Sequence, residues 1–118
     1  MRVPTADATS WETQMRKGLS ELCVLAVIAR GETHGYAILQ TLAASPTLVI
    51  GESALYPLLT RLVEAGHAVV ESRPSPQGPP RRCYRITASG RYRLQRLKLF
   101  HTRQVQETRT LLDAQTHS

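Results

Sequence analysis

One short segment places hydroxyl, phenol and guanidinium groups opposite an apolar stripe. It is ESALYPLLTRLVEAG, residues 52–66, and its apolar residues recur at the spacing of one buried helix face: Leu55, Leu58, Leu59, Leu62 and Val63. The other face then carries Ser53, Tyr56, Pro57, Thr60 and Arg61. Such groups exchange hydrogen bonds with phosphates and base edges, so the pattern indicates recognition of a nucleic acid rather than bond-breaking chemistry.

Positive charge is concentrated in one part of the chain. The 118 residues contain 15 lysines and arginines against nine acids, a net charge of +6, which favours polyanionic partners. No Asp or Glu lies between Ser72 and Gln106, whereas nine cations do: Arg73, Arg81, Arg82, Arg85, Arg91, Arg93, Arg96, Lys98 and Arg103. This window could be a solvated face, but so many like charges repel one another unless an anion lies near, which favours a polyanionic partner.

The sequence offers little for catalysis. It has no glycine-rich phosphate loop and no cluster of histidine, cysteine and carboxylate residues, so we predict that the protein is not an enzyme and has no cofactor or metal. Cys23 and Cys83 lack the spacing of a zinc site, and we expect both to be reduced thiols. No apolar stretch approaches the roughly 20 residues that cross a bilayer, and the first residues lack a signal core. We therefore expect a cytoplasmic protein without membrane contact.

Three helices are expected in the first part of the chain. A capping box at Thr9 predicts a first helix that runs to Arg30. Thr33 is expected to cap a second helix, which ends near Ser45 at a proline breaker. The third helix covers residues 52–66 and is closed by its final glycine.

A hairpin and a last helix are expected to follow. HAVVESR and RRCYRIT, residues 67–73 and 81–87, are typical of two strands because they are rich in β-branched and aromatic residues, and the proline-rich loop between them forms a basic tip. Thr87 caps a final helix with apolar residues on two sides. A chain this small covers a second apolar side most readily with another copy of itself, so we expect a homodimer.

This order of elements is that of a winged helix-turn-helix, whose third helix enters the major groove of DNA. The expected fold class is mainly α with a small β-hairpin wing. We divide it into a flexible N-terminus (1–9), a winged helix-turn-helix DNA-binding domain (10–86) and a C-terminal dimerisation helix (87–118). Tyr56 would then reach the phosphate backbone with its hydroxyl, and Pro57 would give the same face a rigid apolar contact.

The motifs also resemble the PadR-like family of transcriptional regulators over residues 10–100. The segments that carry the resemblance are RKGLSELCVL, HGYAIL at 34–39, SALYPLLTRLVEAG at 53–66 and GPPRRCYRITASGR at 78–91. The resemblance implies a homodimeric repressor or activator that binds a pseudo-palindromic operator. It further implies that the last helix supplies dimer contacts and borders an effector site. The single C-terminal helix is similar to the shorter branch of the family.

The resemblance also assigns contacts to double-stranded DNA. Combined with the polar face described above, it gives nine residues: Tyr36, Ser53, Ala54, Tyr56, Pro57, Thr60, Arg61, Arg81 and Arg82. Three positions depart from the family pattern: Ala54 stands where a small residue or glycine is common, Ala37 where an acid is usual, and Cys83 where an aromatic residue is common. These departures bear on base preference. His34 and Gly35 are interpreted as the ordinary start of a helix whose backbone comes near a phosphate.

The dimer contacts are expected on the last helix and near the N-terminus. The residues are Trp11, Leu22, Leu94, Leu97, Phe100, Val105 and Leu111, with Trp11 closing over the partner's final helix. Polar residues dilute the middle of the apolar side: His101, Gln104 and Thr108. We therefore expect an imperfectly filled seam that accepts a small-molecule effector.

Other interpretations of the same pattern stay open. A winged helix can dock a protein instead of DNA, as an interaction module or antagonist, and binding of a duplex at physiological salt separates the two. A MarR-like ligand-responsive regulator is a further alternative, against which the HGY and LYP motifs argue. Tyr56 could pack against a neighbouring copy rather than contact DNA.

Overall fold

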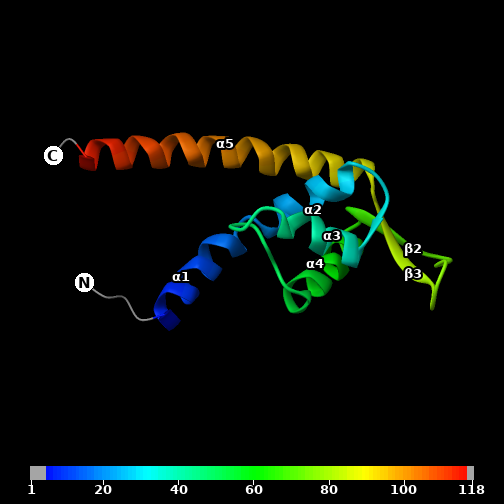
Figure 1. The fold of residues 1–118 in the computed structure, drawn as a ribbon. Coiled ribbons are helices and arrows are strands. Elements are labelled where there is room, and N and C mark those ends of the chain that lie inside the picture. The colour runs from blue at the N-terminus through cyan, green and yellow to red at the C-terminus, as the bar shows by residue number, and fades with distance from the viewer. Residues whose placement is uncertain (1–4, 117–118) are drawn as a thin grey trace.

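Figure 1 shows the computed structural model of the chain, which describes residues 5–116 and the side chains of residues 11–114. The described residues form five helices and three strands. In chain order these are α1 (Thr5–Lys17), α2 (Ser20–Ala29), β1 (Thr33–His34), α3 (Gly35–Ala43), α4 (Glu52–Glu64), β2 (Ala68–Arg73), β3 (Arg81–Ile86) and α5 (Ala88–Thr116). In Figure 1, α1 and α5 extend from the body formed by α2, α3 and α4, and the β2–β3 hairpin projects on the opposite side.

The chain begins with two helices where the sequence predicted one. Between α1 and α2 the Leu19 amide donates to the Arg16 carbonyl oxygen at 3.0 Å, which closes the first helix in a tighter turn. Gly18 lies at this break, and glycine destabilises a helix by about 1 kcal/mol relative to alanine. The single-helix prediction was wrong because the apolar spacing continues across the break while the backbone does not.

The start of α1 also differs from the prediction. Thr9 lies inside α1, which begins at Thr5, so the predicted capping box does not mark the start of a helix. The segment 1–9 that we expected to be flexible is helical from Thr5 onward, and residues 1–4 lie outside the described residues. A cap requires an extended backbone at the capping residue, and the short motif alone does not determine that conformation.

One hydrophobic core joins α2, α3, α4 and the sheet. Its most deeply buried side chains include Leu25 and Ile28 of α2 and Ile38 of α3. α2 is central and contacts α3, β3 and α5, in agreement with its almost continuous apolar sequence. The predicted stripe on α4 is confirmed, because four of its residues are buried: Leu55, Leu58, Leu59 and Leu62.

The end of α4 is a glycine cap, as predicted. Gly66 has a φ of 80°, a left-handed conformation that suits glycine. The His67 amide donates to the Leu62 carbonyl oxygen at 2.8 Å, and the Gly66 amide donates to the Val63 carbonyl oxygen at 3.0 Å. This pair of hydrogen bonds is the Schellman motif, and it turns the chain from α4 toward β2.

The wing is a three-stranded antiparallel sheet in the order β1-β3-β2, whereas the sequence predicted two strands. β1 escaped prediction because it has only two residues, Thr33 and His34, which pair with Tyr84 and Cys83 of β3. The pairing keeps the backbone extended through His34, so α3 begins at Gly35. The predicted cap at Thr33 is therefore wrong, and His34 takes its place.

α5 begins as predicted and then runs beyond the core. The Gly90 amide donates to Oγ1 of Thr87 at 3.0 Å, which confirms the predicted cap. Leu94 and Leu97 pack against the core. Every side chain described after His101 is exposed. Among the described residues, nothing in the same chain therefore buries the second half of α5.

The close approach at Gly90 gives a test of how α5 is joined to the body. A Cβ at Gly90 would lie 2.0 Å from the His67 carbonyl oxygen, a backbone atom that cannot swing aside. We expect Gly90→Ala to lower the free energy of unfolding by about 2 to 3 kcal/mol, measured by urea denaturation. Gly18→Ala is the matched control, since a Cβ there meets no atom within 4 Å. Equal stabilities of the two variants would contradict the close approach.

Candidate nucleic-acid interface

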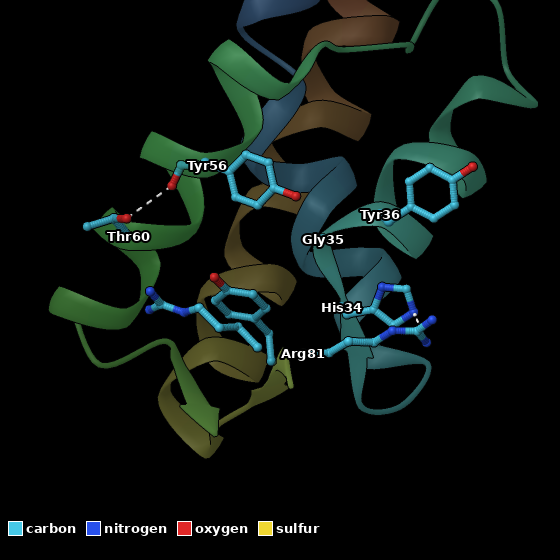
Figure 2. A pocket seen from close by; sticks show the side chains of 8 residues that line it. His34, Gly35, Tyr36, Tyr56, Thr60 and Arg81 are labelled. Atoms are coloured by element: carbon cyan, nitrogen blue, oxygen red, sulfur yellow. Dashed lines mark hydrogen bonds between the residues drawn. The ribbon is translucent and has the colours of Figure 1, made fainter. Parts of the chain in front are cut away.

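One groove gathers residues from α3, α4 and the wing. It has a volume of about 490 Å³ and is lined by His34, Gly35, Tyr36, Tyr56, Thr60, Arg81, Arg82 and Tyr84. Figure 2 shows these side chains around the groove, with Tyr56 and Thr60 on one side and His34 and Tyr36 on the other. The structure thus brings together five of the nine predicted DNA contacts: Tyr36, Tyr56, Thr60, Arg81 and Arg82.

The predicted polar face of α4 lies on the outside of the molecule. All six predicted residues of this helix are exposed: Ser53, Ala54, Tyr56, Pro57, Thr60 and Arg61. The Thr60 hydroxyl donates to the Tyr56 carbonyl oxygen at 3.0 Å, so its oxygen lone pairs stay available to accept from a ligand. Pro57 lies inside α4 and has no amide to donate to the preceding turn, which an exposed helix face tolerates because water can reach the carbonyl oxygen.

Tyr56 lies against the backbone of Gly35 at the start of α3, as Figure 2 shows. A Cβ on Gly35 would be 2.6 Å from the Tyr56 hydroxyl oxygen and 2.7 Å from its ring carbon Cε1. Glycine is the one residue that lets the ring lie so close. Tyr56 still exposes 42% of its surface, so the ring is supported on one side and open on the other. This contact gives the phenol a defined place beside the groove.

His34 connects the start of α3 to the wing. Its Nδ1 accepts a hydrogen bond from the Ala37 amide at 3.3 Å and so caps α3. Its Nε2 lies 3.3 Å from Nη1 of Arg81. The sequence interpretation gave His34 no chemical role. A polar side chain just before a helix was the available signal for the cap, whereas the contact with Arg81 required the pairing of β1 with β3.

Some arginines of the acid-free window form ion pairs. Three of them form ion pairs with acids from elsewhere in the chain: Arg73 with Glu32 at 3.1 Å, Arg85 with Glu71 at 3.3 Å, and Arg93 with Glu21 at 2.7 Å. The hydrogen bond from Arg73 holds the pKa of Glu32 below its ordinary value. Acids from outside the window therefore neutralise part of it, so not all nine of its cations are left for a polyanion.

Three predicted arginines remain without a carboxylate. Within the part of the chain that the structure describes, Arg61, Arg81 and Arg82 take part in no ion pair. Arg81 and Arg82 line the groove, and Arg61 lies on the exposed face of α4. The uncompensated charge near this surface therefore comes from the residues that the sequence assigned to DNA.

The predicted dimer residues occupy two kinds of environment. Trp11, Phe100 and Leu111 expose 53%, 63% and 73% of their surfaces, and Val105 exposes 37%. Leu22 is half-buried. The remaining two, Leu94 and Leu97, pack against the core of their own chain. The exposed apolar surface of α5 instead includes two leucines absent from the predicted set, Leu99 and Leu112.

The described residues supply no other obvious chemical centre. Among them, no three histidine, cysteine or carboxylate side chains come close enough to hold a metal ion. Cys23 and Cys83 are free thiols in half-buried positions, and burial raises the pKa of the Cys23 thiol. In the same part of the chain, no helix combines the length and the apolar character needed to span a bilayer.

The fold and the site together define a winged helix-turn-helix protein, and the predicted fold class is confirmed. The helices α2, α3 and α4 precede the β2–β3 wing, and α4 presents its polar face beside cationic residues of β3. Residues 24–96 match the transcriptional regulator PadR-like family. The chain belongs to this family, which confirms the resemblance found in the motifs, and the protein is a transcriptional regulator rather than an enzyme.

Solved structures of similar proteins agree with this assignment. A PadR-like transcription factor from Bacteroides fragilis is 31% identical, with 86% of this chain and 98% of that chain covered at a TM-score of 0.70. A PadR family regulator from Eggerthella lenta is 27% identical, with 91% and 93% covered at a TM-score of 0.81. A PadR-like regulator from Bacillus cereus is 30% identical, with 84% and 96% covered at a TM-score of 0.74. Comparison with curated proteins gave no match.

The contact between Gly35 and Tyr56 can be tested by binding. We expect Gly35→Ala to fold normally, because alanine favours a helix and the half-exposed ring can swing outward. The displaced phenol should weaken binding to duplex DNA by roughly tenfold in fluorescence anisotropy titrations. In a Tyr56→Ala background, Gly35→Ala should cause no further loss. The same loss in both backgrounds would show that Gly35 acts independently of the ring.

Proposed function

We propose that the protein is a homodimeric repressor that binds a pseudo-palindromic DNA operator. Its membership of a family of transcriptional regulators is the starting point. The observation that supports DNA as the partner is the position of Arg81 and Arg82, which line a groove next to the exposed face of α4. Exposed cations next to a polar helix face are the surface that a phosphate backbone and a major groove require.

In this proposal α4 reads the sequence and the wing holds the backbone. The major groove of B-DNA admits one helix, whose first residues reach base edges. The Ser53 hydroxyl donates to or accepts from bases. The Thr60 hydroxyl, whose proton goes to the Tyr56 carbonyl oxygen, accepts from them, and Arg61 adds a cation on the same helix. Tyr56, supported by Gly35, contacts a phosphate. The phosphate contact positions the duplex, and the base contacts select its sequence.

A second copy of the chain binds the second half-site of the operator. Large apolar side chains of α1 and α5 are exposed: Trp11, Met15, Leu99, Phe100, Val105, Leu111 and Leu112. Monomeric proteins rarely leave so much apolar surface in water. A second copy covers it through the isologous interface of the usual twofold dimer. Trp11 then contacts the final helix of the partner. The dimer spaces its two α4 helices by about 34 Å, one turn of the duplex.

A small-molecule effector acts at the dimer seam in this scheme. A groove of about 530 Å³ lies between α1 and the segment before α4, with Trp11, Met15, Leu19 and Leu48 among its lining residues. Because Trp11 also belongs to the proposed dimer contact, a ligand here shifts one protomer against the other. A ligand that favours the wrong spacing of the α4 helices releases DNA in proportion to its difference in affinity for the two states. This groove supports an effector site near α1 rather than at the middle of α5, where the sequence predicted it.

Selection from random duplexes tests the proposal directly. The full-length protein is incubated with a random duplex pool at physiological salt, and the bound fraction is sequenced over several rounds. We expect an inverted repeat whose half-site centres are about 34 Å apart. A protein that retains no duplex, or retains all sequences equally, is not a sequence-specific repressor, and the protein-docking alternative then gains support.

The wing is tested with the selected duplex. We expect the double substitution Arg81→Ala, Arg82→Ala to weaken all duplexes by similar factors and to reduce the salt slope by about two units per bound protomer. Arg85→Ala is the matched control, because it removes the same charge from the same strand where Glu71 already neutralises it. Its effect on the slope should be much smaller. Equal effects at Arg85 and at the wing pair would show that only net charge matters.

The dimer is tested by sedimentation. We expect the double substitution Phe100→Ala, Leu111→Ala to give monomers in analytical ultracentrifugation and to abolish operator binding. Because both residues are more than half exposed, the core should still melt cooperatively. Arg103→Ala, an exposed polar position on the same helix, should stay dimeric. A dimeric double variant would show that the dimer is built elsewhere.

A further inference from the structure

His34 has a polar neighbour at each ring nitrogen. Nδ1 lies 3.3 Å from the Ala37 amide nitrogen, and Nε2 lies 3.3 Å from Nη1 of Arg81. Figure 2 shows the imidazole beside the guanidinium group at the start of α3. Both neighbours are hydrogen-bond donors, because neither a backbone N–H nor a guanidinium group has a lone pair to offer. The ring therefore faces two donors.

A single imidazole cannot accept from both neighbours. The neutral ring has one N–H and one nitrogen with a lone pair, and the protonated ring has no lone pair at all. If Nδ1 accepts from Ala37, Nε2 carries a proton that points toward Arg81. If Nε2 accepts from Arg81, Nδ1 carries the proton and the Ala37 amide loses its acceptor. In either neutral form, one of the two contacts places one hydrogen-bond donor against another.

The helix cap favours the first of these forms. A side-chain acceptor at the N-cap stabilises a helix, because it accepts from an amide that has no partner within the helix. Arg81 is exposed and can exchange the ring nitrogen for water, so its hydrogen bond to His34 adds little. The form with a proton on Nε2 therefore prevails. In this form the Nε2–H of His34 and the guanidinium of Arg81 present two donors side by side.

We propose that His34 and Arg81 together hold one phosphate of the bound duplex. An oxygen of a phosphodiester accepts from both donors, and its negative charge complements the guanidinium group. The assignment rests on the proposed function, since it takes the partner of the groove to be DNA, and it adds His34 to the contact residues. His34 then works on both sides of its ring: Nδ1 caps α3 and Nε2 contacts the phosphate.

The charges around the pair favour an anion. Two acids of the neighbouring strand segments, Glu32 before β1 and Glu71 in β2, form ion pairs with Arg73 and Arg85. Arg81 takes part in no ion pair among the described residues. The N-terminus of α3, which starts one residue after His34, adds partial positive charge. A phosphate at this place meets a cation, a neutral donor and the positive end of a helix.

The test uses the full-length protein and the selected duplex. His34→Asn is the diagnostic variant, because asparagine keeps an acceptor for the Ala37 amide but is too short to place a donor where Nε2 lies. We expect it to melt like the wild-type protein and to bind about fivefold more weakly. Its salt slope should be unchanged, since a neutral donor releases no counterion, whereas Arg81→Ala should lower the slope by about one unit per protomer.

Single methylphosphonate substitutions in the duplex identify the phosphate. At one position in each half-site, loss of the charge should weaken the wild-type protein by roughly tenfold and leave a His34→Asn, Arg81→Ala double variant almost unaffected. Equal sensitivity of the two proteins at every position overturns the assignment, and so does unchanged affinity of His34→Asn. A wild-type protein that binds no duplex at all overturns the proposed function together with this assignment.

The protonation of the ring gives a readout that does not depend on a variant's affinity. Long-range proton–nitrogen spectra of isotope-labelled histidine distinguish a proton on Nε2 from one on Nδ1, and the signal missing in His34→Asn identifies His34. We expect the Nε2–H form in the complex with the duplex. An Nδ1–H or doubly protonated ring in the complex overturns the assignment, because the cap and the phosphate contact then cannot coexist.

Discussion

The pairing of β1 with β3 is the interaction on which the rest of the site depends. It has only two residues, Thr33 and His34, yet it anchors the start of α3 to the wing. With that anchor in place, Gly35 lies under the Tyr56 ring of α4, and His34 lies beside Arg81. A helix end, a second helix and a strand therefore share one groove. Without the pairing, these side chains would belong to elements free to move apart.

Folding also decides where positive charge remains uncompensated. Acids from α2, β2 and the residue before β1 form ion pairs with Arg93, Arg85 and Arg73. Exposed ion pairs contribute little to stability, so their main effect here is on the distribution of charge. The groove keeps Arg81 and Arg82 without a carboxylate among the described residues. A basic run of sequence thus becomes a local cationic surface rather than a diffuse one.

α5 has two different tasks along its length. Its first part carries Leu94 and Leu97 against the core, next to the glycine contact that joins it to the turn after α4. Its second part carries exposed apolar side chains that nothing in the same chain covers among the described residues. Helices in proteins owe most of their stability to packing of an apolar face, and the proposed dimer gives the second part the packing that the core gives the first part. This division is why the proposed dimer rests on Phe100 and the residues after it.

The sequence by itself determined the features that arise within one or two turns of chain: the buried stripe of α4, its glycine closure, the Thr87 cap and the motifs of the family. It determined the identity of the exposed residues on α4 for the same reason, since helical spacing separates the two faces. Only the tertiary structure decided that β1 exists, that Gly35 supports Tyr56 and that His34 meets Arg81, 47 residues away. These contacts join segments that have no common periodicity. Their partners are chosen by how the elements pack, and a local pattern carries no information about that choice.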